Sequence, residues 1–218
     1  MQGYNAREVM DCYNRTAEEY AETFLDELRH KPFDQNILNR FSNMLPEGSL
    51  IYDFGCGSGQ TTKYIHDKNR HRIIGLDFSE KTIRLAKQNF GEIEFIVDDM
   101  LGSKMPASSA NGILAFYAVV HFTYVEIEQV LREWLRLLKP EGLSLFSFHV
   151  GEEKVDVKDF LGVSGANVTW FFLNPDRVLE IAEQIGFHRE EAVIRYPYKG
   201  YEHESKRAYI ILKKTGST

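Results

Sequence analysis

Cysteine is scarce in this sequence, and its pattern argues against two kinds of small domain. The 218 residues contain only Cys12 and Cys56, which form no Cys-x-x-Cys pair and have no spacing typical of zinc ligands. We therefore expect neither a disulfide framework nor a metal site. The sequence also lacks a hydrophobic run of membrane-spanning length and a charged N-terminal segment followed by an apolar one. A cytoplasmic protein with no membrane contact is expected.

Positive charge is also in short supply. Lys and Arg total 26 against 32 Asp and Glu, which gives a formal net charge of −6. Proteins that bind nucleic acid backbones carry clustered Lys and Arg, so no nucleic acid partner is expected. The length suits one domain with a sizeable core. We expect a monomer or homodimer that acts on a small molecule.

Short apolar segments alternate with amphipathic helical segments along most of the chain. Strands that read as near-continuous apolar runs between helices are typical of a parallel sheet covered on both faces. The last two strands have no helix between them and are expected to pair antiparallel. The prediction is a doubly wound α/β fold, with a mostly parallel seven-stranded sheet, helices on both faces and an antiparallel strand pair at the C-terminal end. Predicted strands cover residues 50–52, 73–76, 94–97, 112–119, 143–150, 191–196 and 208–213.

The chain is expected to form a single domain over residues 1–218, in three parts. Residues 1–46 are predicted to form a helical cover, with one helix capped by Thr16 and another over 33–45. Residues 47–150 are predicted to form a cofactor-binding core. Residues 151–218 would supply the substrate side and the terminal strands, and 151–173 is the least regular segment.

The strongest local signal is a glycine-rich turn that follows the first predicted strand. It reads Asp-Phe-Gly-Cys-Gly-Ser-Gly-Gln over residues 53–60. Three glycines let the backbone turn sharply and approach a ligand closely. Because position 60 is Gln, the dinucleotide pattern Gly-x-Gly-x-x-Gly is not met. Asp53 would repel a pyrophosphate but hold a ligand's ammonium group, so the charge favours a ligand that carries an amino group.

Two further acidic signals follow the next two predicted strands. Asp77 ends the second strand, where a carboxylate is placed to accept ribose hydroxyls, and Phe78 is suited to lie against an adenine. Asp98, Asp99 and Met100 follow the third strand, where a carboxylate is suited to an adenine amino group. Open α/β sheets bind ligands at the carboxyl ends of their strands. The three signals together describe an adenosine that carries an amino acid.

With these motifs in place, the sequence resembles the class I S-adenosylmethionine-dependent methyltransferases, which have a Rossmann-like fold. The glycine turn matches that family's glycine motif, and residues 75–79 (Gly-Leu-Asp-Phe-Ser) match its acidic-loop motif. Residues 97–100 and 137–142 match its adenine-side motif and the turn before its fifth strand. The resemblance is good over about 48–150. It implies S-adenosylmethionine as cofactor and S-adenosylhomocysteine as product.

The resemblance also implies roles for individual residues. The glycine turn would back the methionine part, Asp77 would take the ribose, Asp99 and Met100 would meet the adenine, and Phe116 would border the cofactor. In family members of this shape an N-terminal helix acts as a lid, so Tyr20 is expected to touch the cofactor. The predicted cofactor-binding residues are Asp53, Gly55, Cys56, Gly57, Gln60, Thr61, Asp77, Phe78, Asp99, Met100, Phe116 and Tyr20.

The methyl acceptor should lie beyond the ends of the fourth and fifth strands. Candidate catalytic residues there are Tyr117, His121 and His149, and an imidazole titrates near working pH. The alternative for each histidine is a hydrogen-bonded structural role. No Asn-Pro-Pro-Tyr motif follows the fourth strand, which disfavours base and glutamine methylation. We expect transfer to O, N or C of a small molecule. A macromolecular acceptor (protein or RNA), a nicotinamide-dependent oxidoreductase and a non-catalytic cofactor-binding protein remain as alternatives.

Overall fold

The computed structural model describes residues 3–68 and 70–216, which are built around a seven-stranded sheet with the order β3-β2-β1-β4-β5-β9-β8. The first five strands pair in parallel, and β9 runs antiparallel between β5 and β8. The predicted mostly parallel sheet with an antiparallel pair at one end is confirmed. The strands are β1 (Leu50–Phe54), β2 (Arg72–Asp77), β3 (Glu94–Val97), β4 (Ala110–Ala115), β5 (Leu138–His149), β8 (Phe187–Arg195) and β9 (Arg207–Lys214).

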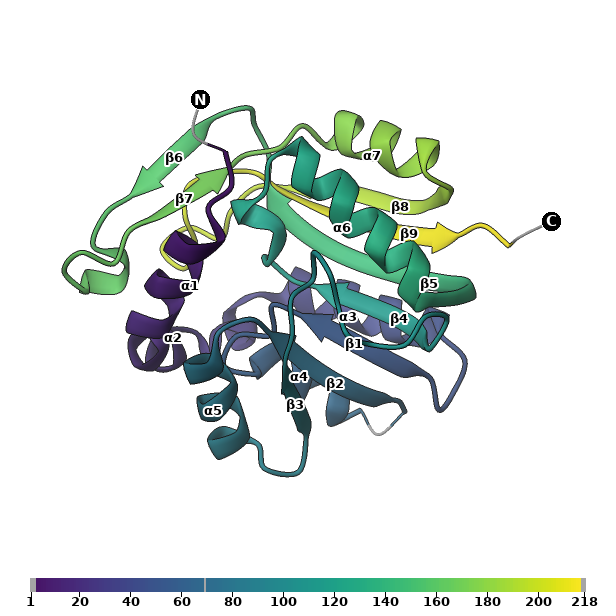
Figure 1. Ribbon diagram of the computed structural model, residues 1–218, viewed down its shortest axis with the longest axis horizontal. Helices are drawn as coiled ribbons and strands as arrows, with labels where there is room; N and C mark the ends of the chain where they lie inside the picture. Colours follow the sequence, from purple (N-terminus) through teal and green to yellow (C-terminus); the bar gives the residue numbers. More distant parts are fainter. Residues whose placement is uncertain (1–2, 69, 217–218) are drawn as a thin grey trace.

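Helices cover both faces of the sheet (Figure 1). On one face, α6 (Tyr124–Leu137) and α7 (Pro175–Gln184) pack onto the larger hydrophobic core, in which Trp134 is fully buried. On the other face, α3 (Pro32–Met44) and α4 (Gln60–His66) close a second core around Phe41. Burial on both faces explains why the central strands are nearly all apolar. The remaining helices are α1 (Ala6–Arg15), α2 (Ala17–Phe24) and α5 (Glu80–Asn89).

Helix starts follow the local capping chemistry. Ser79 caps α5, and its side chain accepts a hydrogen bond from the backbone N–H of Thr82. Thr123 and Glu126 form a capping box at the start of α6. Asn174 caps α7, because its side chain accepts from the backbone N–H of Asp176. Each cap satisfies a backbone donor that has no partner within its helix.

Three predicted strand boundaries are wrong. The strand predicted to begin at residue 191 is β8, which begins at Phe187. The fourth strand ends at Ala115 rather than at residue 119, because Tyr117 takes a left-handed conformation (φ 55°) and the short 3-10 helix η2 (Val119–His121) follows. The fifth strand begins at Leu138, five residues early. Its register against β4 shifts between Ala110 and Gly112, so the predicted turn at 139–142 is an irregularity within the strand.

Two further elements differ from the expectation. Thr16 stands between α1 and α2 and does not cap α2 with its side chain. The Thr16 hydroxyl instead donates to the carbonyl of Cys12, in the last turn of α1. The segment 151–173 is more regular than predicted. It contains an antiparallel hairpin of β6 (Lys154–Val157) and β7 (Val168–Phe171), with the 3-10 helix η3 (Phe160–Gly162) in its loop.

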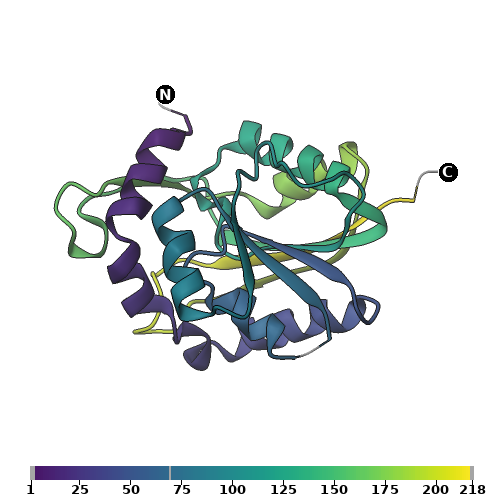
Figure 2. The ribbon, with the colours of Figure 1, turned by 60° about the horizontal axis from the view of Figure 1, so that its bottom comes forward.

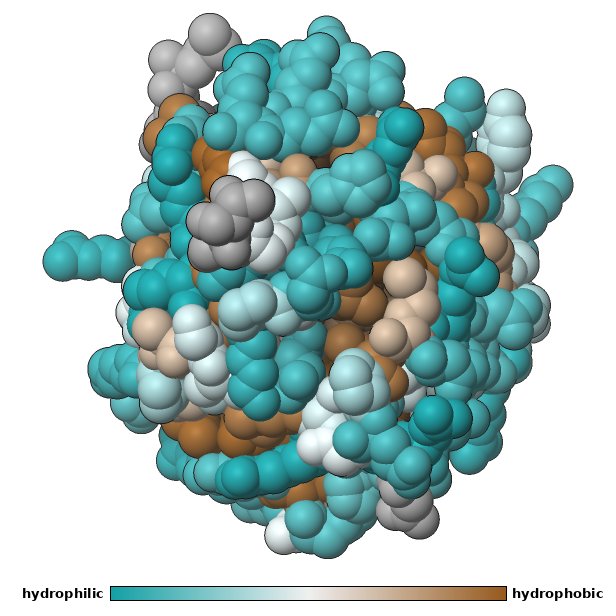
Figure 3. All heavy atoms as spheres, turned by 90° about the vertical axis from the view of Figure 1, so that its right-hand side faces the viewer, coloured by the Kyte–Doolittle hydropathy of each residue, from teal (hydrophilic) through white to brown (hydrophobic). Residues whose placement is uncertain are grey.

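The carboxyl ends of the parallel strands lie beneath α1, α2 and this hairpin. Figure 2 shows α1 passing across this end of the sheet, with the hairpin projecting beyond it. At the opposite end, viewed in Figure 3, hydrophobic residues appear as separate patches among hydrophilic ones. Within 3–68 and 70–216, no helix is long and apolar enough to cross a membrane. The covered end of the sheet is therefore where a ligand site is expected.

The packing around Gly75 gives a test of the fold. A Cβ added to this β2 glycine would lie 2.6 Å from Cε1 of the buried Phe95 ring. Gly75→Ala is expected to lower the free energy of unfolding by about 1–3 kcal/mol through overpacking. Gly102→Ala is the matched control, because a Cβ there meets no atom within 4 Å. Urea denaturation measures both, and equal stabilities for the two variants would contradict the packing described.

Candidate functional site

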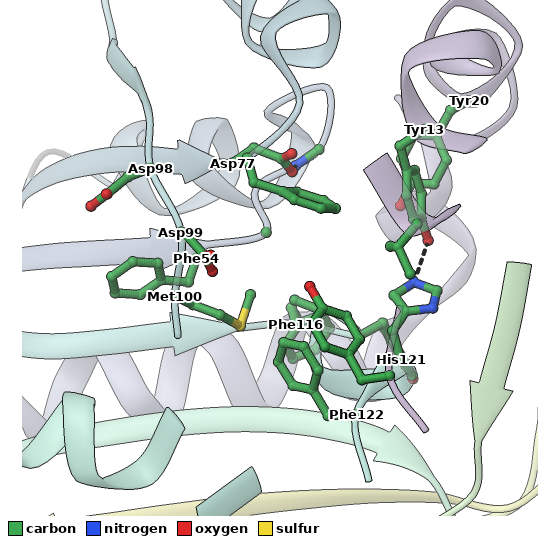
Figure 4. A pocket seen from close by; sticks show the side chains of 17 residues that line it. Tyr13, Tyr20, Phe54, Asp77, Asp98, Asp99, Met100, Phe116, His121 and Phe122 are labelled. Carbon is green, nitrogen blue, oxygen red and sulfur yellow. Dashed lines mark hydrogen bonds between the residues drawn. The ribbon is translucent and has the colours of Figure 1, made fainter. Parts of the chain in front are cut away.

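A cavity of about 660 Å³, open to solvent, lies at the carboxyl ends of β1, β2, β3 and β4. Figure 4 shows Asp77, Asp99 and Met100 on one side of it and Tyr13, Tyr20 and His121 on the other. Its lining residues are Tyr4, Val9, Tyr13, Tyr20, Phe54, Gly55, Gly57, Asp77, Phe78, Asp98, Asp99, Met100, Phe116, Tyr117, Ala118, His121 and Phe122.

The glycine turn forms the back of this cavity. Gly55, Gly57 and Gly59 all have positive φ (67°, 56° and 91°), which a residue with a side chain rarely adopts. A Cβ on Gly55 would also overlap the Cβ of Ala118, which lies in the segment after β4. The turn therefore needs glycine both for its conformation and for its close packing.

Asp77 joins the glycine turn to the loop after β2. One carboxylate oxygen accepts from the backbone N–H of Gly57 (3.1 Å) and the other from that of Ser79 (2.9 Å). Burial, at 8% exposure, raises the pKa of Asp77 to about 6, and its hydrogen bonds with backbone N–H groups oppose this rise. The carboxylate is thus fixed in place at the cavity wall and is ionised at neutral pH.

Asp53 lies deeper than Asp77. It is 1% exposed and accepts a hydrogen bond from the hydroxyl of Thr62 (2.6 Å). Burial raises the pKa of Asp53 to about 7, and the nearby Asp77 adds to the rise. A carboxyl group with this pKa gains or loses its proton near neutral pH, so a cation bound beside it would favour the charged form.

The carboxylates that follow β3 have different surroundings. Asp98 is buried, and its oxygens accept from the hydroxyl of Ser103 and the backbone N–H of Lys104, so it stabilises its own loop. Asp99 is exposed, and its carboxylate accepts from the backbone N–H of Leu101. Figure 4 shows the Asp98 carboxylate turned away from the cavity and Met100 pointing into it.

The N-terminal helices close the cavity with two tyrosines. The hydroxyl of Tyr13, on α1, donates to Nε2 of His121 (2.9 Å), and Nδ1 of His121 donates to the carbonyl of Thr169 on β7 (3.0 Å). The directions follow because a carbonyl only accepts, so Nδ1 carries the proton. Tyr20, on α2, lies against Gly57, where its Cε1 would be 3.2 Å from an added Cβ. The two contacts tie the helical cover to the core.

These hydrogen bonds bear on whether His121 has a catalytic or a structural role. Both of its ring nitrogens have partners, and burial lowers its pKa to about 4, so the ring is neutral at pH 7. The geometry therefore favours a structural role, in which His121 links α1 to the hairpin.

A second cavity, of about 880 Å³, adjoins the first. The two share the five lining residues Tyr13, Tyr20, Gly55, Phe116 and Tyr117. The remaining lining residues of the second cavity come from the α2–α3 region, the glycine turn, the start of α4, η2, the end of β5, the hairpin, and the loop before β9 with its first residue. They are Phe24, Glu27, Lys31, Asp53, Cys56, Gln60, Thr61, Val120, His149, Phe160, Trp170, Tyr201, Glu202, His203 and Arg207.

His149, at the end of β5, lines only the second cavity. Its Nδ1 is hydrogen-bonded to the hydroxyl of Ser205 (2.7 Å), and the part of the chain that the structure describes supplies no partner for Nε2. Burial lowers the pKa of His149 to about 3, and the positive charge of Arg207 adds to this. A neutral imidazole with an unpaired nitrogen beside a cavity can accept a proton from a bound molecule.

Tyr117 separates the two cavities, and a buried hydrogen-bonded ring holds it there. The hydroxyl of Tyr209 donates to Asp34 (2.7 Å), so it accepts a hydrogen bond from the hydroxyl of Tyr117 (2.5 Å). Arg195 completes the ring by donating to Asp34 (2.7 Å) and, at 3.4 Å, to the Tyr117 hydroxyl. The proton of the Tyr117 hydroxyl is thus already committed. The arrangement favours a positioning role for its aromatic ring over proton transfer by its hydroxyl.

The predicted cofactor residues fall into two groups. Gly55, Gly57, Asp77, Phe78, Asp99, Met100, Phe116 and Tyr20 line the first cavity, while Asp53, Cys56, Gln60 and Thr61 line the second, on the other side of the glycine turn. The sequence analysis missed Tyr13 and the charged residues of the second cavity, Glu27, Lys31, Glu202 and Arg207. The seven-residue spacing of Tyr13 and Tyr20 does not explain their meeting, because α1 ends at Arg15 and the two tyrosines lie on separate helices. The charged residues come from three separate loops and strands and carry no local pattern.

Comparisons with known proteins agree with this geometry. Residues 51–142 match the family model described as "Methyltransferase domain". This segment contains the glycine turn, Asp77, Asp99 and Phe116. The fold is also that of a solved structure from Methanosarcina mazei described as an S-adenosylmethionine-dependent methyltransferase. That structure has a TM-score of 0.71 and 17% sequence identity, over 80% of this chain and 96% of the other.

Two curated relatives share part of the sequence. A tRNA (carboxymethyluridine(34)-5-O)-methyltransferase of Mus musculus is 28% identical over 140 residues, which are 64% of this chain and 19% of that protein. A 2-phytyl-1,4-naphtoquinone methyltransferase of Thermosynechococcus vestitus is 32% identical over 103 residues, 45% of each chain. The match thus spans less than half of either relative. The family model covers less than half of this chain, within the segment that forms most of the first cavity, and the fold is shared with a solved S-adenosylmethionine-dependent methyltransferase.

The contact between Tyr13 and His121 gives a test of the helical cover. Tyr13→Phe leaves Nε2 of His121 without its donor, and is expected to lower the free energy of unfolding by about 1–3 kcal/mol. It should also weaken the binding of S-adenosylhomocysteine, because Tyr13 lines the first cavity. Tyr64→Phe is the control, since it removes a hydroxyl bonded to Asn39 (3.1 Å) outside both cavities. Unfolding and calorimetric titration measure the two effects. Unchanged cofactor binding in Tyr13→Phe would contradict a closing role for α1.

Proposed function

We propose that this protein transfers the methyl group of S-adenosylmethionine to an O, N or C atom of a small molecule bound in the second cavity. The observation that carries the proposal is the shared wall of the two cavities at Gly55, Phe116 and Tyr117. A donor with its adenosine in the first cavity would present its sulfonium group at this wall to an acceptor in the second cavity. Methyl transfer from a sulfonium is an in-line displacement, for which an enzyme mainly supplies position and orientation.

In this proposal the first cavity holds the adenosine. Asp77 accepts from the ribose hydroxyls, Phe78 lies against the adenine, and Asp99 and Met100 border the adenine edge. The methionine part follows the glycine turn toward Gln60 and Thr61, with its ammonium group near Asp53. Two features support this order, namely the fixed carboxylate of Asp77 and the buried Asp53, which becomes charged near neutral pH.

For an acceptor that loses a proton on methylation, we propose His149 as the base. Among Tyr117, His121 and His149, only His149 has a side-chain proton acceptor beside the second cavity with no partner among the described residues. In this proposal Nδ1 carries the ring proton and donates it to the hydroxyl of Ser205, which leaves Nε2 of the neutral ring to accept a proton. Burial lowers the pKa of the ring to about 3, so His149 is a weak base that suits an acceptor whose proton becomes acidic during methyl transfer. Tyr117 would position the acceptor with its ring.

A tRNA acceptor is the main alternative, because one curated relative is named a tRNA methyltransferase. Two observations weigh against it. The net charge is −6, and α1, α2 and the hairpin cover the approach to the site. Incubation of the protein with radiolabelled methyl donor and a cell extract would distinguish a small-molecule acceptor from a tRNA acceptor. Label in the small-molecule fraction supports the proposal, and label confined to RNA or protein would replace it.

Calorimetric titration tests the cofactor assignment before any acceptor is known. S-adenosylhomocysteine is expected to bind saturably and NADH not at all. Binding of NADH alone would favour an oxidoreductase. Binding of S-adenosylhomocysteine without methyl transfer to any extract fraction would favour a non-catalytic binding protein.

Asp77 gives the sharpest mutational prediction. Asp77→Asn places an amide N–H₂ group where an oxygen now accepts from the backbone, and removes the charge proposed to hold the ribose. The affinity for S-adenosylhomocysteine is expected to fall by about 10- to 100-fold, equivalent to about 1.4–2.8 kcal/mol. Asp98→Asn is the control, because that carboxylate is turned into its own loop. Equal losses in the two variants would contradict the proposed ribose contact.

Asp53 gives a pH prediction. Its pKa of about 7 in the free protein means that the carboxyl is largely neutral below that pH, and a bound ammonium group would lower its pKa. The affinity for S-adenosylhomocysteine is therefore expected to rise between about pH 6 and about pH 8, with an upper limit of about tenfold per unit for one proton released. Titration in buffers of different ionisation enthalpy would detect this proton release. Asp53→Asn should bind S-adenosylhomocysteine more weakly, and its binding should no longer release the proton that comes from the Asp53 carboxyl. An affinity that falls with rising pH would contradict the ammonium contact.

A further inference from the structure

Aromatic rings from three distant parts of the chain meet in the second cavity. The His149 ring at the end of β5 lies nearly parallel to Trp170 on β7, with centroids 5.6 Å apart and planes at 27°. His203, in the loop before β9, meets both rings edge-on at 5.7 and 5.5 Å. Phe160 meets Trp170 edge-on at 6.1 Å. We call these four cavity-lining residues the ring wall.

The ring wall leads back to the cofactor cavity. Phe160 is edge-on to Tyr13 at 5.9 Å, and Tyr13 is edge-on to Tyr20 at 5.7 Å. Both tyrosines line the two cavities. A flat molecule lying on the ring wall would thus reach the boundary between the two cavities, where the methyl group is proposed to be transferred.

Charged residues line the same cavity, and they occur as balanced pairs. Lys31 pairs with Glu27 (2.5 Å), and Arg207 pairs with Glu202 (3.3 Å). Lys31 also lies 3.7 Å from Glu202, so the two pairs form one cluster. Three of the four side chains are less than 10% exposed, and Glu27 is 16% exposed. Glu202 has a further partner in Arg195, at 2.7 Å. The paired groups therefore attract no ion of either sign on balance, and Asp53, the other acidic side chain that lines this cavity, is the proposed partner of the cofactor's ammonium group.

The pairing matters because aromatic rings also attract cations. A cationic acceptor would gain from the ring wall but would meet Lys31 and Arg207. An anionic acceptor would meet Glu27 and Glu202. A neutral acceptor avoids both penalties and can still form hydrogen bonds with the paired groups.

We propose that the methyl acceptor is a flat, uncharged aromatic or heteroaromatic molecule that packs against the ring wall, with its polar edge toward the Lys31–Glu202 cluster. The proposal rests on the proposed function, since it names the acceptor class for the same site. Flat rings pack well against aromatic side chains in offset or edge-on geometry, and the gain exceeds that from buried area alone. A saturated ring of the same size would lack this additional binding free energy from aromatic packing.

Trp170 provides a reporter that needs no known acceptor. The sequence has two tryptophans, and Trp134 is fully buried under α6, outside both cavities. The indole N–H signal of Trp170 in a ¹H–¹⁵N NMR spectrum, assigned with Trp170→Phe, therefore reports on occupancy of the ring wall. Protein saturated with S-adenosylhomocysteine would be titrated with four probes, namely phenol, cyclohexanol, benzoate and benzylammonium.

Phenol is expected to shift the Trp170 signal and leave that of Trp134 in place, with an affinity about 2- to 10-fold above that of cyclohexanol and of both ions. Phe160→Leu should remove this preference for phenol over cyclohexanol. Phe187→Leu, which alters a buried ring at the start of β8 outside both cavities, should retain it.

The inference is overturned if cyclohexanol or either ion binds as well as phenol, or if no probe shifts the Trp170 signal up to its solubility limit. These outcomes are distinct from failure of the proposed function. That failure would appear first, as absence of S-adenosylhomocysteine binding in the calorimetric titration.

Discussion

The site depends on the hydrogen bonds that Asp77 accepts from the backbone of Gly57 and Ser79. They join the glycine turn after β1 to the loop after β2, and so fix two neighbouring strand ends relative to each other. The hydrogen bonds hold a buried carboxylate ionised at neutral pH against the cost of its burial. Without a fixed carboxylate at this point, the first cavity would lose the group best suited to a ribose.

The N-terminal helices and the C-terminal half of the chain complete the site from opposite ends of the sequence. Tyr13 reaches the hairpin through His121, and Lys31 and Asp34 reach Glu202 and Arg195. These contacts give the second cavity its shape, while the 51–142 segment supplies most of the first. The family match over residues 51–142 therefore bears on the cofactor cavity, while the acceptor has to be inferred from the walls of the second cavity.

Much of the fold was predictable, because the strand and helix patterns in the parallel core are local. The glycine turn, Asp77 and the Ser79 cap all follow from residues close in sequence. The left-handed Tyr117, which shortens β4, was not predictable, because its hydroxyl is bonded to Tyr209 and Arg195 from distant segments. The β6–β7 hairpin was likewise missed.

A crystal structure of the complex with S-adenosylhomocysteine tests the central claim most directly. The account predicts adenosine in the first cavity with ribose hydroxyls bonded to Asp77, and a sulfur atom at the shared wall beside Phe116 and Tyr117, facing the second cavity. A ligand whose sulfur faces away from the second cavity, or whose ribose makes no contact with Asp77, would contradict it.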